Sequence, residues 1–153
     1  MVNPKKGKID ISDLIRDDFP PYKDGRICSE AFEKALASYS EIYVPAGRYY
    51  IDRSLVIGSD TTITANENAE IILVKSCKTL LLRNASVIDG SERKIGKGAP
   101  CDRNITIKGG VWGEENTERL GYGASGCYDE NDGMHGVSTC FLFSGVKNLA
   151  IEN

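Results

Sequence analysis

Short runs of β-branched, aliphatic and aromatic residues alternate with Pro, Gly, Asn and Asp between Glu41 and Val74. Such runs predict β-strands, and the residues between them predict tight corners. The runs are shorter than the about 5–6 residues of an ordinary strand, so a flat sheet built from them would be a poor one. We therefore expect these strands to stack on further strands. The runs are Ile42–Val44, Tyr49–Ile51, Leu55–Ile57, Thr61–Thr64 and Ile71–Val74.

Similar phrases recur along the chain, at Asp60–Thr64, Arg103–Ile107 and Val146–Ile151. Their central apolar residues lie 42 and then 44 positions apart, and another candidate, Leu80–Val87, lies near the middle of the first interval. This spacing predicts a repeat of about 21–22 residues, which falls in the range that is typical of solenoid proteins.

A solenoid explains how such short strands can be stable. One coil cannot bury its inward side chains alone, so the next coil is stacked on it and pairs with it in parallel. A coil of about 22 residues cut into three strands predicts a parallel β-helix, in which loops inserted at the corners carry the function. An ordinary β-sandwich, which also has turns at about 8–12-residue spacing, is the alternative.

One amphipathic helix is predicted ahead of the coils. Ser29 can cap it, and Glu30 and Glu33 complement its positive N-terminal end. We expect this helix to cover the first coil, whose apolar interior and strand edges would otherwise meet water. Its apolar face is formed by Phe32, Ala35, Leu36 and Tyr39, which recur at helical spacing.

The length of 153 residues suits one domain with a sizeable core. Residues 1–23 are predicted to form an N-terminal tail and lead-in, with a flexible segment at Met1–Lys8 and a short strand at Ile9–Ile11. Residues 24–153 are predicted to form the coils. The content of 41% hydrophobic and 27% charged residues is typical of a globular protein.

Charge, cysteines and hydropathy exclude several classes of protein. The net charge of −3 argues against general nucleic-acid binding. The five cysteines are an odd number at irregular spacing, so we expect reduced thiols and neither a metal nor a cofactor site. No apolar run is long enough to span a bilayer. No secretory signal follows Met1, which predicts a cytoplasmic protein as written, or an extracellular one if an export signal was removed.

The first half of the chain resembles a known family. A turn at Asp24–Gly25, a helix containing Ala31–Leu36 and the phrase Ile42–Ile51 are similar to the N-terminus of the pectin-lyase-like superfamily, closest to glycoside hydrolase family 28, the polygalacturonase-like enzymes. Phage tailspike proteins belong to the same superfamily. Later phrases at Val87–Gly90 and Asn104–Trp112 extend the resemblance, which covers residues 24–153.

This resemblance implies an all-β fold, a right-handed parallel β-helix of the single-stranded solenoid type with one N-terminal capping helix. The sequence departs from the family pattern in places. Ile27, Cys28 and Ser29 stand where the family has Thr-Asp-Asp, and Ala46 and Arg48 replace Pro and Thr. These departures put the activity in doubt more than the fold.

The catalytic residues that the resemblance implies are absent from this sequence. The family cleaves uronic-acid polysaccharides by inversion, with carboxyl groups about 6.5–9.5 Å apart. The family places Asn-Thr-Asp, Asp-Asp, Gly-His-Gly and Arg-Ile-Lys phrases on later coils, and none of these phrases is present here. Asp17–Asp18 precedes the helix, and Met134–Gly136 echoes Gly-His-Gly only loosely. We therefore predict no catalytic residue in this chain.

A wall of a sugar-binding groove is the chemistry that remains. The aromatic face of Trp112 can stack on a sugar ring, and the long polar loop Glu114–Gly136 carries groups that bind hydroxyls or a sugar carboxylate. The alternative is that Trp112 packs beneath this loop. Asp129–Gly133 is rich in oxygen ligands but fails the EF-hand spacing for calcium. The substrate-binding candidates are Trp112, Glu115, Asn116, Arg119, Tyr122, Tyr128 and His135.

The last predicted strand, Val146–Ile151, is not followed by a cap. Terminal coils of solenoids are normally capped, so we expect the chain to be the N-terminal part of a longer β-helix, truncated at its C-terminal end. Its open face predicts a homo-oligomer.

Three functional hypotheses follow. The first is a non-catalytic portion of a carbohydrate-active protein that binds an acidic polysaccharide. The second is a tailspike-type adhesin module without hydrolysis, and the third is a structural remnant.

Overall fold

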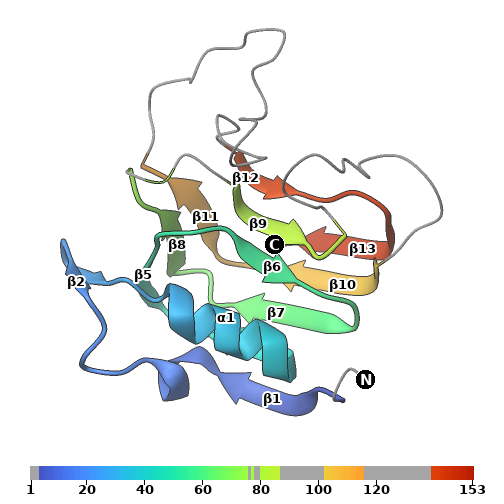
Figure 1. The fold of residues 1–153 in the computed structure, drawn as a ribbon, viewed down its shortest axis with the longest axis horizontal. Helices are drawn as coiled ribbons and strands as arrows, with labels where there is room; N and C mark the ends of the chain where they lie inside the picture. Colours follow the sequence, from blue (N-terminus) through green and yellow to red (C-terminus); the bar gives the residue numbers. More distant parts are fainter. Residues whose placement is uncertain (1–3, 76, 78–79, 87–101, 116–138) are drawn as a thin grey trace, which may run out of the picture.

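A computed structural model describes residues 4–75, 77, 80–86, 102–115 and 139–153 (Figure 1). Strands predominate in this part of the chain, together with one α-helix, α1 (Ser29–Ser38), and one 3-10 helix, η1 (Ile11–Leu14). The strands are β1 (Lys6–Asp10), β2 (Pro21–Tyr22), β3 (Gly25–Arg26), β4 (Tyr39–Val44), β5 (Gly47–Ile51), β6 (Leu55–Ile57), β7 (Thr61–Ala65), β8 (Ala69–Leu73), β9 (Leu80–Asn84), β10 (Asp102–Lys108), β11 (Val111–Glu114), β12 (Thr139–Leu142) and β13 (Val146–Glu152).

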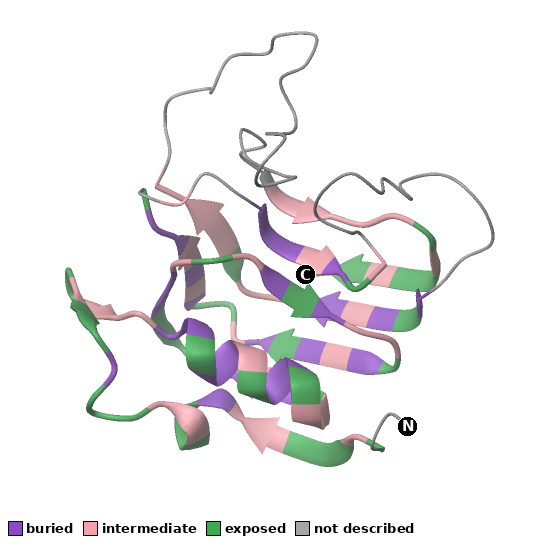
Figure 2. Cartoon of the chain, viewed as in Figure 1, coloured by how far each residue is buried: buried purple, intermediate pink, exposed green. Residues whose placement is uncertain are grey.

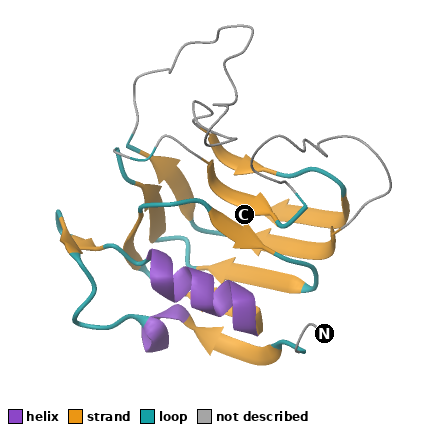
Figure 3. Ribbon diagram, viewed as in Figure 1, coloured by secondary structure: helices purple, strands orange, loops and turns teal. Residues whose placement is uncertain are grey.

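The strands form three parallel sheets, and consecutive strands along the chain join sheet 1, sheet 2 and sheet 3 in turn. Sheet 1 has the order β1-β4-β7-β10-β13, sheet 2 has β5-β8-β11 and sheet 3 has β6-β9-β12. From β4 onward, each strand pairs with the strand three places later in the chain, so each successive coil contributes one strand to every sheet (Figure 1). The strands, orange in Figure 3, make up most of the described chain. The described fold is therefore β-helix-like and all-β, as predicted. Only the small β2–β3 pair is antiparallel within the described residues.

The predicted repeat length holds for one step of the stack. Ile42 pairs in register with Ile63, 21 residues later. The next step is longer, because residues 87–101 intervene between β9 and β10, and it pairs Ile63 with Ile107. The comparison of repeated phrases within the sequence matches Ile63 with Ile105 instead. That error of two residues keeps both side chains on the same side of the sheet.

The proposed repeat copy at Leu80–Val87 is wrong. Leu80–Asn84 forms β9, which pairs with β6 and β12 in sheet 3, whereas the phrases it was compared with lie in sheet 1. An apolar run indicates an inward-facing strand, but it does not tell which sheet of the coil the strand joins. The rest of that phrase, from Val87, lies outside the described residues.

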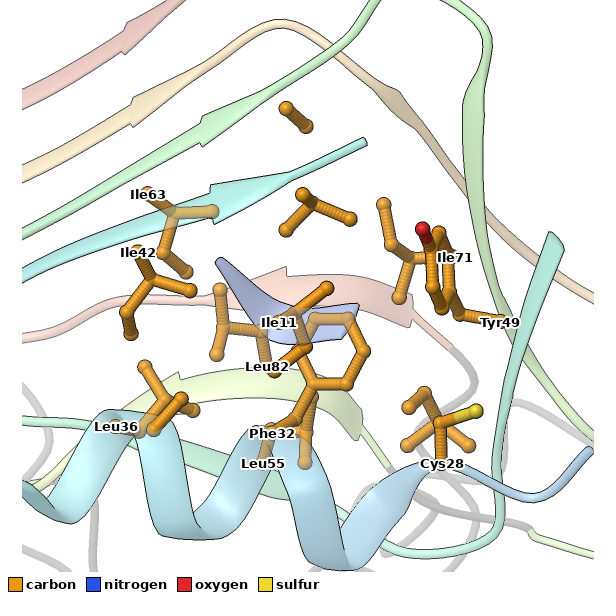
Figure 4. Close-up of a cluster of buried hydrophobic side chains, with 14 of the residues drawn as sticks. Ile11, Cys28, Phe32, Leu36, Ile42, Tyr49, Leu55, Ile63, Ile71 and Leu82 are labelled. Carbon is orange, nitrogen blue, oxygen red and sulfur yellow. The ribbon is translucent and has the colours of Figure 1, made fainter. Parts of the chain in front are cut away.

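Inward side chains of the three sheets meet in one apolar core. Figure 4 shows Ile42 and Ile63 from sheet 1, Ile71 from sheet 2 and Leu82 from sheet 3 turned toward a common centre. Each of these residues is at most 2% exposed. Short strands are stabilised here because residues in register on neighbouring strands of each sheet pack their side chains together.

Helix α1 covers the N-terminal end of the stack, as predicted. It packs on β6, β4 and η1, and its buried face alternates with an exposed one (Figure 2). Phe32 is 1% exposed and meets the ring of Tyr49 edge-on, with 5.8 Å between ring centroids. The helix takes the place that a strand beneath β6 would occupy, so the first coil does not open to water.

The segment before α1 is more ordered than predicted. The expectation of a flexible tail at Met1–Lys8 is wrong for its last residues, because Lys6–Asp10 forms β1 and pairs in parallel with β4. The strand predicted at Ile9–Ile11 corresponds to the end of β1, and Ile11 begins η1. A further bridge joins Ile27 to Tyr50 of β5. The lead-in thus supplies a partial extra layer under the first complete coil.

The predicted cap of α1 is also corrected. The N-cap residue is Cys28, which makes no side-chain capping bond within the described part of the chain. Ser29 is the first helical residue and is completely buried. Its Oγ donates to Asp52 Oδ1 at 2.6 Å and accepts from the Asp52 backbone N–H at 2.9 Å. Ser29 therefore joins the start of α1 to the corner between β5 and β6.

Replacing Ser29 with alanine is expected to lower the free energy of unfolding by about 1–2 kcal/mol, since both hydrogen bonds are lost at a buried site. Ser12 provides a matched control, because its Oγ also donates to a carboxylate oxygen, Asp10 Oδ1, at 2.6 Å but on the exposed surface. Ser12→Ala should change stability by less than about 0.5 kcal/mol. Urea unfolding followed by circular dichroism measures both, and equal effects would contradict the assigned role of Ser29.

A ladder of side chains runs along the start of three sheet 1 strands. Asp60, Asn104 and Asn148 have left-handed backbones, with φ of 56°, 55° and 62°. Asn104 Nδ2 donates to Asp60 Oδ1 at 2.8 Å, and Asn148 Nδ2 donates to Asn104 Oδ1 at 3.0 Å. Asp and Asn tolerate this conformation better than other residues with side chains. The ladder aligns the coils at the corner that leads from sheet 3 to sheet 1.

Candidate functional site

Two of the seven predicted substrate-binding residues, Trp112 and Glu115, lie in the described part of the chain. The remaining five lie outside the described residues, and so does the tested calcium segment Asp129–Gly133. These five are Asn116, Arg119, Tyr122, Tyr128 and His135.

Trp112 faces the interior of the coil stack. It pairs in register with Ile71, whose side chain is fully buried, so the indole lies on the inward side of β11. Its Nε1 donates to the Gly109 carbonyl at 3.0 Å, and its ring meets Phe141 edge-on at 5.2 Å. This geometry favours the packing alternative over stacking on a sugar ring.

Glu115 directly follows the last residue of β11 and lies at the border of a polar surface cluster. The Tyr22 hydroxyl donates to Glu115 Oε1 at 3.0 Å, and the Lys23 ammonium group donates to Glu115 Oε2. The Glu115 side chain is only 16% exposed. The β2–β3 hairpin, which carries Tyr22 and Lys23, is thereby tied to the end of β11 although more than 90 residues separate them.

The cluster continues across the outer face of sheet 2. Arg48 Nε donates to Glu70 Oε2 at 2.7 Å, and Arg48 Nη1 donates to Asp24 Oδ2 at 2.9 Å. The Tyr50 hydroxyl donates to the other oxygen of Asp24 at 2.5 Å. We call the whole set the sheet 2 patch, and it comprises Tyr22, Lys23, Asp24, Arg48, Tyr50, Glu70 and Glu115.

Hydrogen bonds shift the pKa values of Asp24, Arg48 and Tyr50 in the patch. The hydrogen bond from Tyr50 is the main reason that the pKa of Asp24 is lowered, and the same bond raises the pKa of Tyr50. The hydrogen bond to Glu70 is the main cause of the raised pKa of Arg48. At neutral pH Asp24 is thus ionised, while Tyr50 keeps its proton. A general acid in glycoside cleavage needs the opposite, a carboxyl group with a raised pKa.

Sequence reasoning missed most of this patch, although one signal was available. Arg48 and Glu70 are 22 residues apart, which is the predicted coil length, and they pair in register between β5 and β8. Opposite charges one coil apart on the outward side predict an ion pair. The contribution of Tyr22, Lys23 and Asp24 gave no such signal, because it depends on how the hairpin folds against β5.

A second polar cluster is buried inside the stack. Asp102 is 8% exposed and Asn84 is fully buried. Asn84 Nδ2 donates to Asp102 Oδ2 at 2.7 Å, and the Ser86 backbone N–H donates to the same oxygen at 2.8 Å. The Ser144 N–H in turn donates to Asn84 Oδ1 at 2.9 Å. These bonds join the end of β9, the start of β10 and the corner before β13.

The described residues offer no metal site, because no cluster of His, Cys, Asp and Glu in them has the geometry to hold an ion. Cys28 and Cys140 are free thiols, as expected. Burial raises the pKa of Cys28 to about 11, which makes it a poor nucleophile. In the same part of the chain, no helix combines the length and the apolar character that a membrane span requires.

Comparisons with models of protein families, with curated proteins and with solved structures find no match to this chain.

Proposed function

We propose that this chain forms the N-terminal, non-catalytic coils of a right-handed parallel β-helix that binds polysaccharide, in a protein similar to the glycoside hydrolases that act on pectin-like substrates. The observation that supports it is the rotation of strands through three parallel sheets, with α1 over the first coil. The sequence resemblance led to the same architecture. The free thiols Cys28 and Cys140 support a reducing, cytoplasmic setting.

The sheet 2 patch supports a role in binding. Tyr22 is partly exposed and packs edge-on against the buried ring of Tyr50 at 4.8 Å, which holds one aromatic side chain next to the charged groups. Carboxylates such as Glu115 accept hydrogen bonds from sugar hydroxyls, and Arg48 and Lys23 can exchange a protein carboxylate for that of a uronic acid. The low pKa of Asp24 supports binding without cleavage.

Affinity electrophoresis in gels containing polygalacturonate tests this proposal. The chain should be retarded, and Lys23→Gln or Tyr22→Phe should weaken binding by about 2–10-fold, the effect of one hydrogen bond. Tyr43→Phe is the control, because Tyr43 lies in β4 of sheet 1, away from the patch. Retardation that is equal for all three variants would contradict the role of the patch.

Measurement of reducing ends separates this proposal from a hydrolase. No release above the blank is expected from polygalacturonate or other acidic glycans, and robust release by this chain alone would overturn the proposal. The second candidate, a tailspike-type adhesin module, is favoured if binding extends across a glycan panel with no preference for pectin-like polymers. Absence of binding to any glycan in the panel contradicts both.

A further inference from the structure

A shallow hollow lies on the outer face of sheet 1, over β1, β4 and β7. Its volume is about 80 Å³. Pockets that enclose a whole ligand have volumes of about 300–1,000 Å³, so this hollow can seat one face of a single small ring and no more. It is lined by Lys8, Glu41, Ile42, Tyr43, Thr62 and Thr64.

Strand pairing brings the polar side chains of the hollow together. Glu41 of β4 pairs in register with Lys8 of β1 and with Thr62 of β7. Tyr43 of β4 pairs in register with Thr64 of β7. The residue that separates the two lining residues on each of β4 and β7 is buried in the core, so the polar side chains of the hollow project outward. Paired strands lie about 4.8 Å apart, which lets groups on neighbouring strands contact the same small ring.

The polar groups of the hollow are available to a ligand. Among the described residues, the side chains of Glu41, Thr62 and Thr64 have no hydrogen-bond or ion-pair partner. Lys8 is in register with Glu41, yet its ammonium group lies over the ring of Tyr43, 5.9 Å from the centroid. The sheet 2 patch differs, because its charged groups already bind one another. A ligand can therefore bind in the hollow without displacing a hydrogen bond within the described structure.

The chemistry of these groups fits a neutral ring that carries hydroxyls. The Glu41 carboxylate can accept hydrogen bonds from two hydroxyls, and the threonine hydroxyls both donate and accept. The ring of Tyr43 supplies an apolar surface for the C–H groups of a sugar ring. Lys8 and Glu41 are the only charged residues that line the hollow, so its net charge is zero and it offers no excess positive charge to an acidic ligand.

We propose that the outer face of sheet 1 holds a binding site for one neutral sugar unit, in which Glu41, Thr62 and Thr64 bind the hydroxyls of the ring. This site is independent of the proposed function, because it shares no residue with the sheet 2 patch. Each unit of polygalacturonate carries a carboxylate that Glu41 repels. Retardation in polygalacturonate gels therefore reports on the sheet 2 patch and leaves the sheet 1 site untouched.

Titration of the isotope-labelled chain with the methyl glycosides of glucose, galactose and mannose, followed by amide chemical shifts in NMR spectra, tests the site. At least one glycoside should bind with a millimolar dissociation constant and shift the amides of β4 and β7. Glu41→Gln should raise that constant at least about tenfold, the effect of a hydrogen bond to a charged group. Asp17→Asn is the control, because it removes the same charge from an exposed turn ahead of α1. Absence of saturable shifts with all three glycosides would overturn the proposal.

A pair of threonine variants tests where the ring lies. Thr62→Val removes a hydroxyl, keeps a β-branched side chain and should raise the dissociation constant about 2–10-fold. Thr106→Val is the matched control, because Thr106 is level with Thr62 on the next strand, β10, but does not line the hollow. Equal effects of the two variants would exclude the assigned position. Methyl galacturonoside should bind more weakly than methyl galactoside, and equal or tighter binding would exclude a site for neutral sugars.

Discussion

Ile71→Ala is expected to lower the free energy of unfolding by about 2–5 kcal/mol, the usual cost of removing a large aliphatic side chain from a closed core. Ile71 is 0% exposed and lies in β8 between Tyr49 of β5 and Trp112 of β11. The cavity cannot collapse easily, because strands on both sides are held in register. Urea unfolding followed by the fluorescence of Trp112, the only tryptophan, measures the loss.

The neighbouring residue Ile72 provides the matched control, with the same side chain on the same strand. Ile72 pairs in register with Tyr50 and Gly113 and lies on the outer, partly exposed side of sheet 2. Ile72→Ala should therefore cost about 1 kcal/mol or less. A larger loss for Ile72→Ala than for Ile71→Ala would mean that β8 faces the other way. The inward ladders of the whole stack would then be assigned incorrectly.

The sequence was sufficient to predict the strands and their inward side chains, because side-chain alternation depends on the residues of one strand alone. The runs that contain Ile42, Ile63 and Ile71 were predicted as strands with inward apolar side chains, and these three residues are buried. The register between coils was harder to predict. The first step from β4 to β7 has the predicted length, but the next contains the 87–101 segment, and the length of an inserted loop leaves no periodic signal in the sequence.

The candidate site was predicted less well than the fold. Trp112 was considered for sugar stacking because its aromatic face can stack on a sugar ring, with packing as the alternative. It pairs in register with the buried Ile71, so its side chain lies on the inward side of β11 and has a packing role. Arg48 and Glu70 could have been paired from the coil length. Tyr22 and Asp24 could not, because their position depends on a short hairpin that is stabilised by contacts with distant residues.

The buried cluster around Asp102 shows a further limit. Asp102 and Asn84 are polar residues at the ends of strands, where sequence patterns predict solvent-exposed corners. In the structure both side chains are buried, and Asn84 Nδ2 donates a hydrogen bond to Asp102 Oδ2. Burial raises the pKa of Asp102, but the hydrogen bonds from Ser86 and Asn84 outweigh that effect and hold its pKa below the ordinary value. Asp102 is therefore ionised within the stack.

The second large effect is expected from Asp102→Asn, which should lower the free energy of unfolding at pH 7 by about 2–3 kcal/mol, the cost of losing hydrogen bonds to a buried charge. An amide has one acceptor oxygen and no charge to offer to Asn84 and Ser86. Asp60 is the control, since Asp60→Asn keeps an oxygen that can accept from Asn104 on the exposed surface. Asp60→Asn should change stability by less than about 0.5 kcal/mol.

The pH dependence of the stability loss shows whether Asp102→Asn acts by removing the carboxylate charge or by changing the local geometry. Because the pKa of Asp102 is lower in the folded state than in the unfolded chain, the ionised carboxylate stabilises the fold above about pH 4, the ordinary pKa of aspartate. This contribution is lost as the pH falls through the folded-state pKa. The stability difference between the parent protein and Asp102→Asn should accordingly shrink below about pH 4. A difference that stays constant from neutral to acidic pH would show that the charge of Asp102 does not join β9 and β10.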